Sequence, residues 1–250
     1  MALPALVLVH GGGVAADCWD LTVDEIQRQA PELTVLAVDL PGRRDKTGDL
    51  IGARIRNWVD SVVSDVETAG IDNLVIVGHS MGGLIVPGVV GKLGSSRVRE
   101  MVLAAAYVPP NGLALVDTFP GLLGWYARSS SRRNEQKGKF GTLPTPWAKF
   151  VFCNGMTRAQ RRFVVDRLYP DSPSVIRDKV DRTDLPDDVP RSWILTQRDR
   201  ALPVESQRKG IDAIGGVQTL IEVDTCHMLM VSEPERLAEI LVDRCRLYAT

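Results

Sequence analysis

Six short apolar runs recur along the chain and alternate with segments whose apolar residues repeat at helical spacing. Apolar runs of roughly 4–8 residues are typical of buried strands in a parallel sheet. Their alternation with helices predicts an α/β fold with a mostly parallel, six-stranded sheet flanked by helices. The predicted strands span residues 5–9, 34–38, 73–77, 100–105, 192–196 and 218–223.

Two of the predicted helices have a clear apolar face. The first ends at Gly70, because glycine is favoured just after the last helical turn, and its apolar stripe consists of Ile55, Trp58, Val59, Val62, Val63 and Val66. The last helix has Ser232 as its candidate N-cap and Pro234 in its first turn. We expect it to pack against the sheet through Leu237, Ile240, Leu241 and Cys245.

The alternation breaks between about residues 109 and 190, where no strand is predicted. This segment is too long for a plain loop, so we expect a helical cap inserted before the last two strands. Within it, the polar and positively biased residues 128–139 are expected to form a mobile, solvated loop. Steering of anionic substrates is the alternative role of that loop.

Aromatic residues concentrate in the expected cap. It holds nine of the 14 Phe, Trp and Tyr residues, namely Phe119, Trp125, Tyr126, Phe140, Trp147, Phe150, Phe152, Phe163 and Tyr169. A cap over a reactive site excludes water and lines an apolar pocket, and Trp125 and Trp147 are the candidates for that lining. The alternative is that each aromatic ring only packs the cap's own small core.

Length and charge limit the classes of function. A chain of 250 residues with 44% hydrophobic content suits one domain spanning residues 1–250. The net charge of −1 and the pI near 6.3 give no general attraction to nucleic acid or anionic membranes. The N-terminal residues enter the first strand without a basic region or a separate apolar segment, which favours a cytoplasmic location. The oligomeric state stays open.

The third apolar run leads directly into residues 78–82, Gly-His-Ser-Met-Gly, with a further glycine at position 83. After a buried strand, G-x-S-x-G is typical of a nucleophile elbow, whose small residues allow a sharp turn that lifts the serine above the sheet. A serine hydroxyl is a poor nucleophile at neutral pH and needs a histidine base, an orienting carboxylate and oxyanion donors. Ser80 is the candidate nucleophile of a serine hydrolase.

A base and an acid follow Ser80 in the chain. His227 lies between the sixth strand and the last helix and is the candidate base, although a loop histidine can also merely cap a neighbouring group. Asp199, in the loop after the fifth strand, is the candidate acid, and its alternative is an exposed aspartate paired with an adjacent arginine. The order Ser, Asp, His is typical of α/β-hydrolases, not of chymotrypsin or subtilisin types. Asp39 and Asp117 are the rival acids.

The first predicted strand ends in a glycine loop, His10-Gly11-Gly12-Gly13. Glycines let a backbone approach a ligand closely, and the residue after the nucleophile commonly supplies one oxyanion donor. The backbone N–H groups of Gly12 and Met81 are therefore the candidate donors, while His10 is expected to brace the loop. The loop lacks the Lys-Ser/Thr of a P-loop and the spacing of G-x-G-x-x-G, which disfavours a nucleotide site.

Four cysteines show neither a C-x-x-C pair nor the spacing of metal ligands: Cys18, Cys153, Cys226 and Cys245. We therefore expect no metal and no disulfide. Cys226 adjoins the candidate base, but it has no strand-to-helix turn of its own. It is expected to be a half-buried bystander thiol.

Several of these segments together resemble α/β-hydrolases of the plant methylesterase and hydroxynitrile lyase type. The likeness runs over nearly the whole chain and is closest at the two ends. It is carried by Leu8–Gly11, Val77–Gly83, Leu103–Ala106, Asp199 with Pro203 and Gln207, and Cys226–Met228 leading to Ser232–Pro234. The resemblance implies an α/β-hydrolase fold and a cofactor-free carboxylesterase with Ser80 as nucleophile, His227 as base and Asp199 as acid. Gly11, His79 and Met228 join Trp125 and Trp147 as pocket candidates.

Two positions depart from the lyases of that family. One lyase type has a lysine after the catalytic histidine and a threonine after the first histidine, and the other has an asparagine after the first histidine. This chain has Met228 and Gly11 there, which disfavours cyanohydrin cleavage. We expect a carboxylesterase that cleaves a small to medium hydrophobic or aromatic ester through an acyl-enzyme. The alternatives are a hydroxynitrile lyase, a cofactor-free dioxygenase or a small-molecule receptor with low turnover.

Overall fold

The computed structural model describes residues 2–250 and contains one six-stranded parallel sheet. The strand order is β2-β1-β3-β4-β5-β6. All six predicted strands are confirmed, and their bounds are β1 (Ala5–Val9), β2 (Val35–Val38), β3 (Leu74–His79), β4 (Val98–Ala104), β5 (Arg191–Thr196) and β6 (Thr219–Val223). The predicted α/β fold with a parallel sheet is therefore correct.

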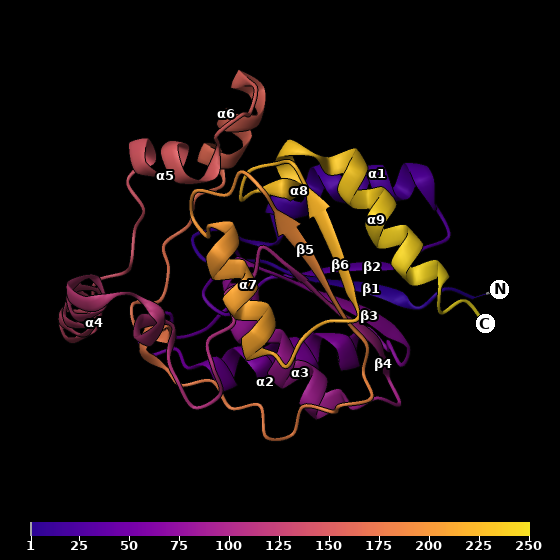
Figure 1. The fold of residues 1–250 in the computed structure, drawn as a ribbon, viewed down its shortest axis with the longest axis horizontal. Helices are drawn as coiled ribbons and strands as arrows, with labels where there is room; N and C mark the ends of the chain where they lie inside the picture. The colour runs from indigo at the N-terminus through magenta and orange to yellow at the C-terminus, as the bar shows by residue number, and fades with distance from the viewer. Residues whose placement is uncertain (1) are drawn as a thin grey trace.

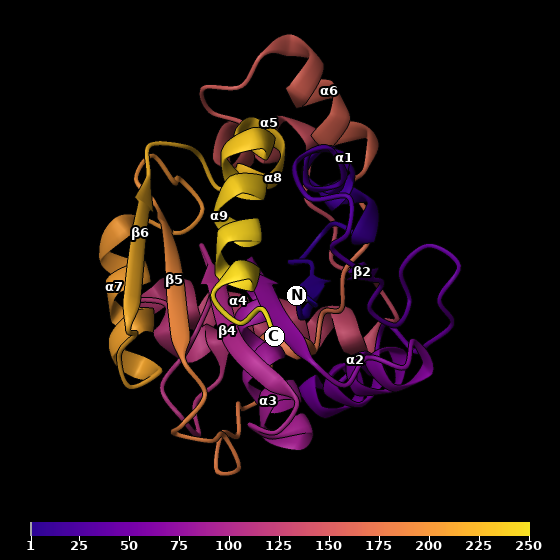
Figure 2. The same ribbon diagram turned by 90° about the vertical axis from the view of Figure 1, so that its right-hand side faces the viewer.

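Helices cover both faces of the sheet (Figures 1 and 2). On one face lie α1 (Asp20–Gln29), α8 (Leu229–Ser232) and α9 (Pro234–Arg246), and on the other lie α2 (Ile55–Thr68), α3 (Val86–Leu93) and α7 (Val204–Ala213). Successive strand residues point to opposite faces. Strand β1 thus contributes Val7 and Val9 to one hydrophobic core and Leu6 and Leu8 to the other.

The helix signals were correct for α2 and partly wrong for α9. The apolar stripe of α2 faces the core, and Gly70 has the left-handed φ of +65° that ends such a helix without strain. Ser232 is not the N-cap of α9, which is Glu233, while Pro234 does begin the helix. Instead, Ser232 ends α8, and its hydroxyl hydrogen bonds with Thr225 Oγ1 at 2.7 Å.

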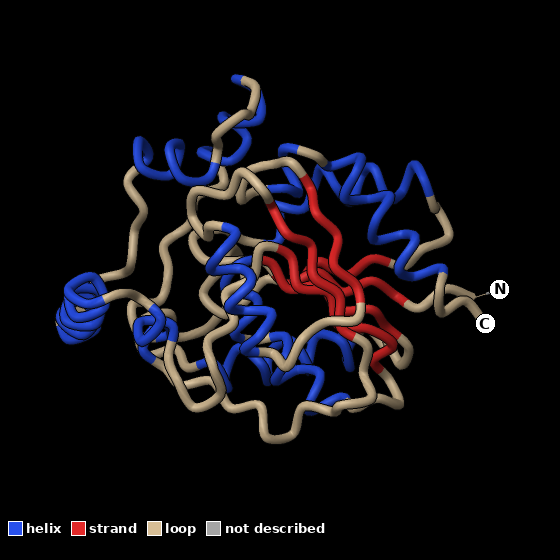
Figure 3. Tube along the Cα trace, viewed as in Figure 1, coloured by secondary structure: helices blue, strands red, loops and turns tan. Residues whose placement is uncertain are grey.

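Between β4 and β5 the chain forms the helical cap expected from the sequence. The cap contains α4 (Gly121–Gln136), α5 (Thr145–Phe152), α6 (Arg158–Asp166) and the short turns η3 (Leu115–Thr118) and η4 (Val175–Arg177). Figure 3 shows this segment as helices joined by long loops outside the central sheet. The assignment of residues 1–250 to one domain stays a prediction.

The predicted mobile loop over residues 128–139 is wrong, because α4 continues through Gln136. Its polar residues find partners within the protein. Ser131 is buried and accepts a hydrogen bond from Arg177 Nε at 2.6 Å, and Glu135 forms ion pairs with Arg177 and Arg54. The polar composition of this segment therefore did not distinguish a solvated loop from a helix with charged contacts.

Among residues 2–250, no helix is long and apolar enough to cross a membrane.

A buried ion pair joins β4 to α9. Glu100 is fully buried, Arg244 Nε donates to its two carboxylate oxygens at 2.9 and 3.0 Å, and Arg244 Nη2 forms an ion pair with Oε1 at 2.8 Å. The Ser192 hydroxyl also donates to Glu100. A carboxylate removed from water requires such partners, so the pair fixes the position of α9 on the sheet.

Replacing Arg244 by methionine should lower the free energy of unfolding by about 3–5 kcal/mol, because the Glu100 carboxylate is then buried without its cation. The double variant Glu100→Gln/Arg244→Met should recover most of that loss. Urea unfolding of the three proteins measures both effects. A single variant within about 1 kcal/mol of the wild type would contradict this role of the ion pair.

Candidate active site

Ser80 lies at the end of β3, where the chain turns sharply into the short helix η2 (Ser80–Leu84). Its φ is +52°, a left-handed conformation that L-residues adopt only at a cost. The glycines around it make room for neighbouring backbone, since a Cβ on Gly83 would lie 2.6 Å from the Tyr107 carbonyl oxygen. Tyr107 N–H in turn donates to the Ser80 carbonyl at 2.8 Å. These contacts hold the turn as the G-x-S-x-G pattern predicts.

Three side chains from separate loops form a continuous hydrogen-bonded chain. His227 Nε2 lies 3.0 Å from Ser80 Oγ, and His227 Nδ1 lies 2.7 Å from Asp199 Oδ2. All three residues are buried, with exposed fractions of 6% for Ser80, 7% for Asp199 and 1% for His227. The structure therefore brings together the serine, histidine and aspartate selected from the sequence.

Asp199 is held by more than its contact with His227. Its Oδ1 accepts hydrogen bonds from the N–H groups of Ala201 at 2.8 Å and Leu202 at 2.7 Å, and its Oδ2 accepts one from Thr196 Oγ1 at 2.9 Å. Burial acts to raise the pKa of Asp199, but the charge and hydrogen bond of His227, with the Leu202 and Thr196 donors, lower it.

An ionised Asp199 fixes the proton positions on His227. A carboxylate can only accept hydrogen bonds, so His227 donates through Nδ1 and its Nε2 is free to accept the Ser80 proton. This tautomer is the one that a general base next to a serine requires. The geometry can therefore remove a proton from Ser80 Oγ.

The carboxylates of the two rival acids bind backbone N–H groups elsewhere in the protein. Asp39 accepts the Ala16 N–H at 2.8 Å, and Asp117 accepts the Ala114 N–H at 2.9 Å. Each carboxylate therefore supports a short helical turn by binding a backbone donor. The aspartate that contacts His227 is Asp199, in the loop after β5.

Two further histidines brace the site. His79 Nε2 donates to the His227 carbonyl at 2.9 Å, and His10 donates to the Gly11 carbonyl at 2.8 Å while accepting the Leu40 N–H at 3.1 Å. Burial lowers the pKa of both His10 and His79 to about 3, so both are neutral at physiological pH. The predicted bracing role of His10 is confirmed.

The glycine loop passes directly beside Ser80. A Cβ on Gly11 would lie 2.7 Å from Ser80 Cβ, so only glycine permits this approach. In the part of the chain that the structure describes, the N–H groups of Gly12 and Met81 donate to no protein acceptor. Two unpaired backbone donors next to a nucleophile can bind a developing negative charge.

The cap aromatics differ in their relation to the site. Phe152, at the end of α5, stacks on His227 with ring centroids 5.3 Å apart, whereas Trp125 and Trp147 are 68% and 55% exposed. Trp147 contacts Phe150 at 5.6 Å between centroids. Met228, next to His227, is buried. Spacing could not single out Phe152, because nine aromatic residues share this segment.

Cys226, the residue before His227, is a free thiol, and it is fully buried, not half-buried as predicted. Burial raises the pKa of Cys226, which keeps it in the weakly nucleophilic thiol form.

Among residues 2–250, no group of three or more His, Cys, Asp or Glu side chains is arranged to hold a metal ion.

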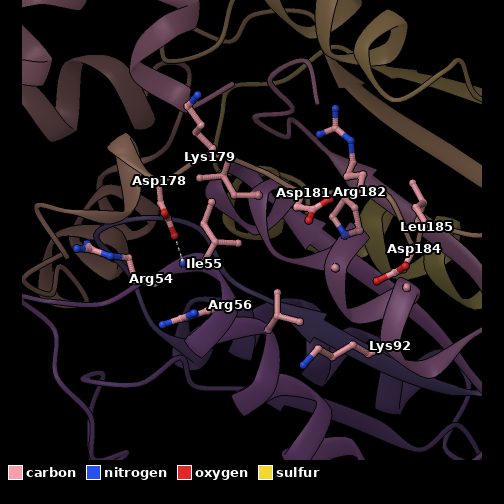
Figure 4. A pocket seen from close by; sticks show the side chains of 15 residues that line it. Arg54, Ile55, Arg56, Lys92, Asp178, Lys179, Asp181, Arg182, Asp184 and Leu185 are labelled. Atoms are coloured by element: carbon pink, nitrogen blue, oxygen red, sulfur yellow. Dashed lines mark hydrogen bonds between the residues drawn. The ribbon is translucent and has the colours of Figure 1, made fainter. Parts of the chain in front are cut away.

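Two of the protein's surface cavities are large enough for a small molecule. One of about 840 Å³ adjoins the Asp199 loop and is lined by Tyr107, Leu113, Phe119, Ala201 and Leu202, among others. The other, of about 540 Å³, lies between α2, α3 and residues 178–185. Figure 4 shows that its charged side chains point in different directions, so they do not converge on one ligand position.

The chain is similar in sequence to proteins named as a hydrolase and a methylesterase. The chain is 27% identical to (E)-2-((N-methylformamido)methylene)succinate hydrolase of Acinetobacter baylyi over an alignment of 188 positions, which covers 68% of this chain and 67% of that protein. It is 24% identical to putative methylesterase 11, chloroplastic, of Arabidopsis thaliana over an alignment of 266 positions, gaps included, which covers 96% of this chain and 64% of that protein.

A solved structure matches over almost the full chain. An extracellular alpha/beta-hydrolase of a Paenibacillus species, described as homologous to tobacco salicylic acid binding protein 2, has a TM-score of 0.83 at 23% identity. The match covers 97% of this chain and 99% of that one. The model of the alpha/beta hydrolase family matches residues 6–240. The chain therefore belongs to the alpha/beta hydrolase family.

Proposed function

We propose that the protein is a serine carboxylesterase in which Ser80 is the nucleophile, His227 the general base and Asp199 the orienting acid. The observation that carries this proposal is the unbroken chain of hydrogen bonds from Asp199 through His227 to Ser80 Oγ in a buried site. Relatives named as hydrolases and methylesterases support ester hydrolysis as the reaction class.

The first half of the reaction acylates Ser80. As Ser80 Oγ bonds to the ester carbonyl carbon, His227 Nε2 takes the hydroxyl proton and Asp199 stabilises the resulting imidazolium. The N–H groups of Gly12 and Met81 stabilise the tetrahedral oxyanion. When the ester C–O bond breaks, His227 returns the proton to the leaving alkoxide, and the acyl group remains on Ser80.

The second half of the reaction hydrolyses the acyl-enzyme. His227 Nε2 removes a proton from water, whose oxygen bonds to the acyl carbon, and the same two N–H groups stabilise the new oxyanion. Breakage of the bond to Ser80 Oγ releases the carboxylic acid, and His227 returns the proton to the serine. No cofactor takes part in these steps.

An uncharged, hydrophobic or aromatic ester of small to medium size fits this site best. Phe152 stacks on His227, and the buried Met228 follows His227 in the chain, so apolar side chains adjoin the base. Gly11 and His79 lie against Ser80 and the His227 loop, while Trp125 and Trp147 are candidates for outer contacts made by the cap. A small-molecule ester is the proposed partner.

Cellular location stays a prediction. The cytoplasm is expected from the sequence, whereas one relative is named chloroplastic and one structural neighbour extracellular.

Replacing Ser80 by alanine should lower kcat for p-nitrophenyl butyrate by at least about 10⁴-fold without changing the melting temperature appreciably, because no other group supplies the attacking oxygen. The matched control is Cys226→Ala, which removes the thiol next to His227 and should retain activity. Steady-state kinetics and labelling by a fluorophosphonate probe measure the effect. Turnover by Ser80→Ala near that of the wild type would remove Ser80 from the mechanism.

Replacing Asp199 by asparagine should lower kcat by about 10⁴-fold, since the amide can donate to His227 Nδ1 and so favour the wrong tautomer. Asp117→Asn is the control, because Asp117 makes its contacts at Ala114 and Arg128. The same ester assay compares the two variants. Loss of activity in the Asp117 variant with retention in the Asp199 variant would show that the acid is misassigned.

A further inference from the structure

One residue of the glycine loop is held by the cap at both of its backbone groups. Gly13 N–H donates to Asp171 Oδ2 at 2.7 Å, and Tyr169 N–H donates to the Gly13 carbonyl at 2.9 Å. Gly13 has a φ of +70°, a conformation that glycine adopts without steric cost. The segment that carries Tyr169 and Asp171 therefore fixes the residue immediately after Gly12.

Asp171 is itself rigidly held. Its backbone exchanges two hydrogen bonds with Gly141, at 2.7 and 2.8 Å, and its Oδ1 accepts the Ser172 N–H at 2.7 Å. The same oxygen forms an ion pair with Arg43. Asp171 thus contacts another part of the cap through its backbone and the loop beside Ser80 through its carboxylate.

Arg43 ties this carboxylate to the body of the protein. Its side chain is fully buried, its Nε donates to the Val14 carbonyl at 3.2 Å, and its guanidinium lies 5.6 Å from the ring centroid of Trp58. Among residues 2–250, Asp171 is the one carboxylate within ion-pair distance of Arg43. A buried cation needs such a partner, so the ion pair with Arg43 holds the Asp171 carboxylate next to Gly13 and Val14.

The structure leaves no room for a side chain at Gly12. A Cβ on Gly12 would lie 2.7 Å from Asp171 Oδ2 and would also overlap the Met81 sulfur. Gly12 is therefore enclosed between the carboxylate of the cap and the residue that follows the nucleophile. The Gly13 N–H that donates to Asp171 belongs to the peptide group directly after Gly12, so Asp171 holds the backbone on one side of the Gly12 Cα.

We propose that Asp171 is a positioning residue that holds the Gly12 N–H in place for the oxyanion. This inference rests on the proposed function, because it assumes that an oxyanion forms at Ser80. Oxyanion donors are effective only when they are aligned before the reaction, and a displacement of about 1 Å can cost about 100-fold in rate. The cap then acts in the chemical step through Asp171, although Asp171 does not touch the substrate.

Two double variants isolate the hydrogen bond to Gly13 from the ion pair. Arg43→Met/Asp171→Asn and Arg43→Met/Asp171→Leu both lack the buried charges, and only the asparagine keeps an oxygen for the Gly13 N–H. The control Arg167→Met removes a different pair between cap and body, the contact of Arg167 with Asp20 at 3.2 Å. Unfolding in urea establishes the stability of each protein.

The readouts are kcat and KM for p-nitrophenyl acetate and inhibition by an aryl trifluoromethyl ketone. Ser80 Oγ adds to the ketone carbon, the hydroxyl proton passes to His227 Nε2, and the ketone oxygen becomes an oxyanion like that of the ester reaction. The leucine variant should have a kcat about 10–100-fold below that of the asparagine variant, with KM within about threefold. Its inhibition constant for the ketone should rise by a similar factor.

Equal kcat and equal ketone inhibition in the two double variants would overturn the role of Asp171 while leaving the esterase proposal intact. A wild-type protein that neither hydrolyses esters nor reacts with a fluorophosphonate would overturn both. If the leucine variant does not fold, Asp171→Glu replaces it, because the longer side chain moves the carboxylate from Gly13 but keeps its charge. A kcat for Asp171→Glu equal to that of the wild type would likewise overturn the proposal.

Discussion

The left-handed backbone of Ser80 is the constraint on which the rest of the site depends. A non-glycine residue with φ of +52° persists only where its surroundings over-determine it. Here the surroundings are β3, whose alternating side chains are buried in two cores, and the glycines that let Tyr107 and the loop at Gly11 approach closely. The sheet stabilises a turn that would not form alone, and the turn presents the hydroxyl at the edge where the other loops converge.

Because the site is buried, each of its polar side chains needs a hydrogen-bond partner within the protein. Asp199 satisfies its carboxylate with two backbone donors, one hydroxyl and His227, so its charge is retained in a dry environment. His79 and His10 are kept neutral by burial and serve as hydrogen-bonding groups of fixed tautomer. The same lack of water that makes these contacts strong makes any unpaired group costly, which explains why the buried Arg43 is paired with Asp171 of the cap.

Local patterns were sufficient for the sheet and for the three candidate site residues. Each strand is a short apolar run, and Ser80, Asp199 and His227 follow strand ends that parallel topology brings to one edge. Local sequence patterns did not predict the contacts between segments that are far apart in the chain. Residues 128–136 are helical and contact Arg177 and Arg54, the stacking of Phe152 depends on where α5 lies, and the contact of Asp171 with Gly13 spans 158 residues. No local spacing encodes such partners.

The most direct test of the proposed mechanism is to identify the covalent intermediate. Turnover of p-nitrophenyl butyrate is quenched with acid in the steady state, and the digested protein is examined by mass spectrometry. The mechanism predicts a butyryl group on the peptide that contains Ser80, in an amount that decays when the substrate is exhausted. Rapid turnover accompanied by an acyl group on Cys226 instead, or by none on a method shown to preserve serine esters, would contradict it.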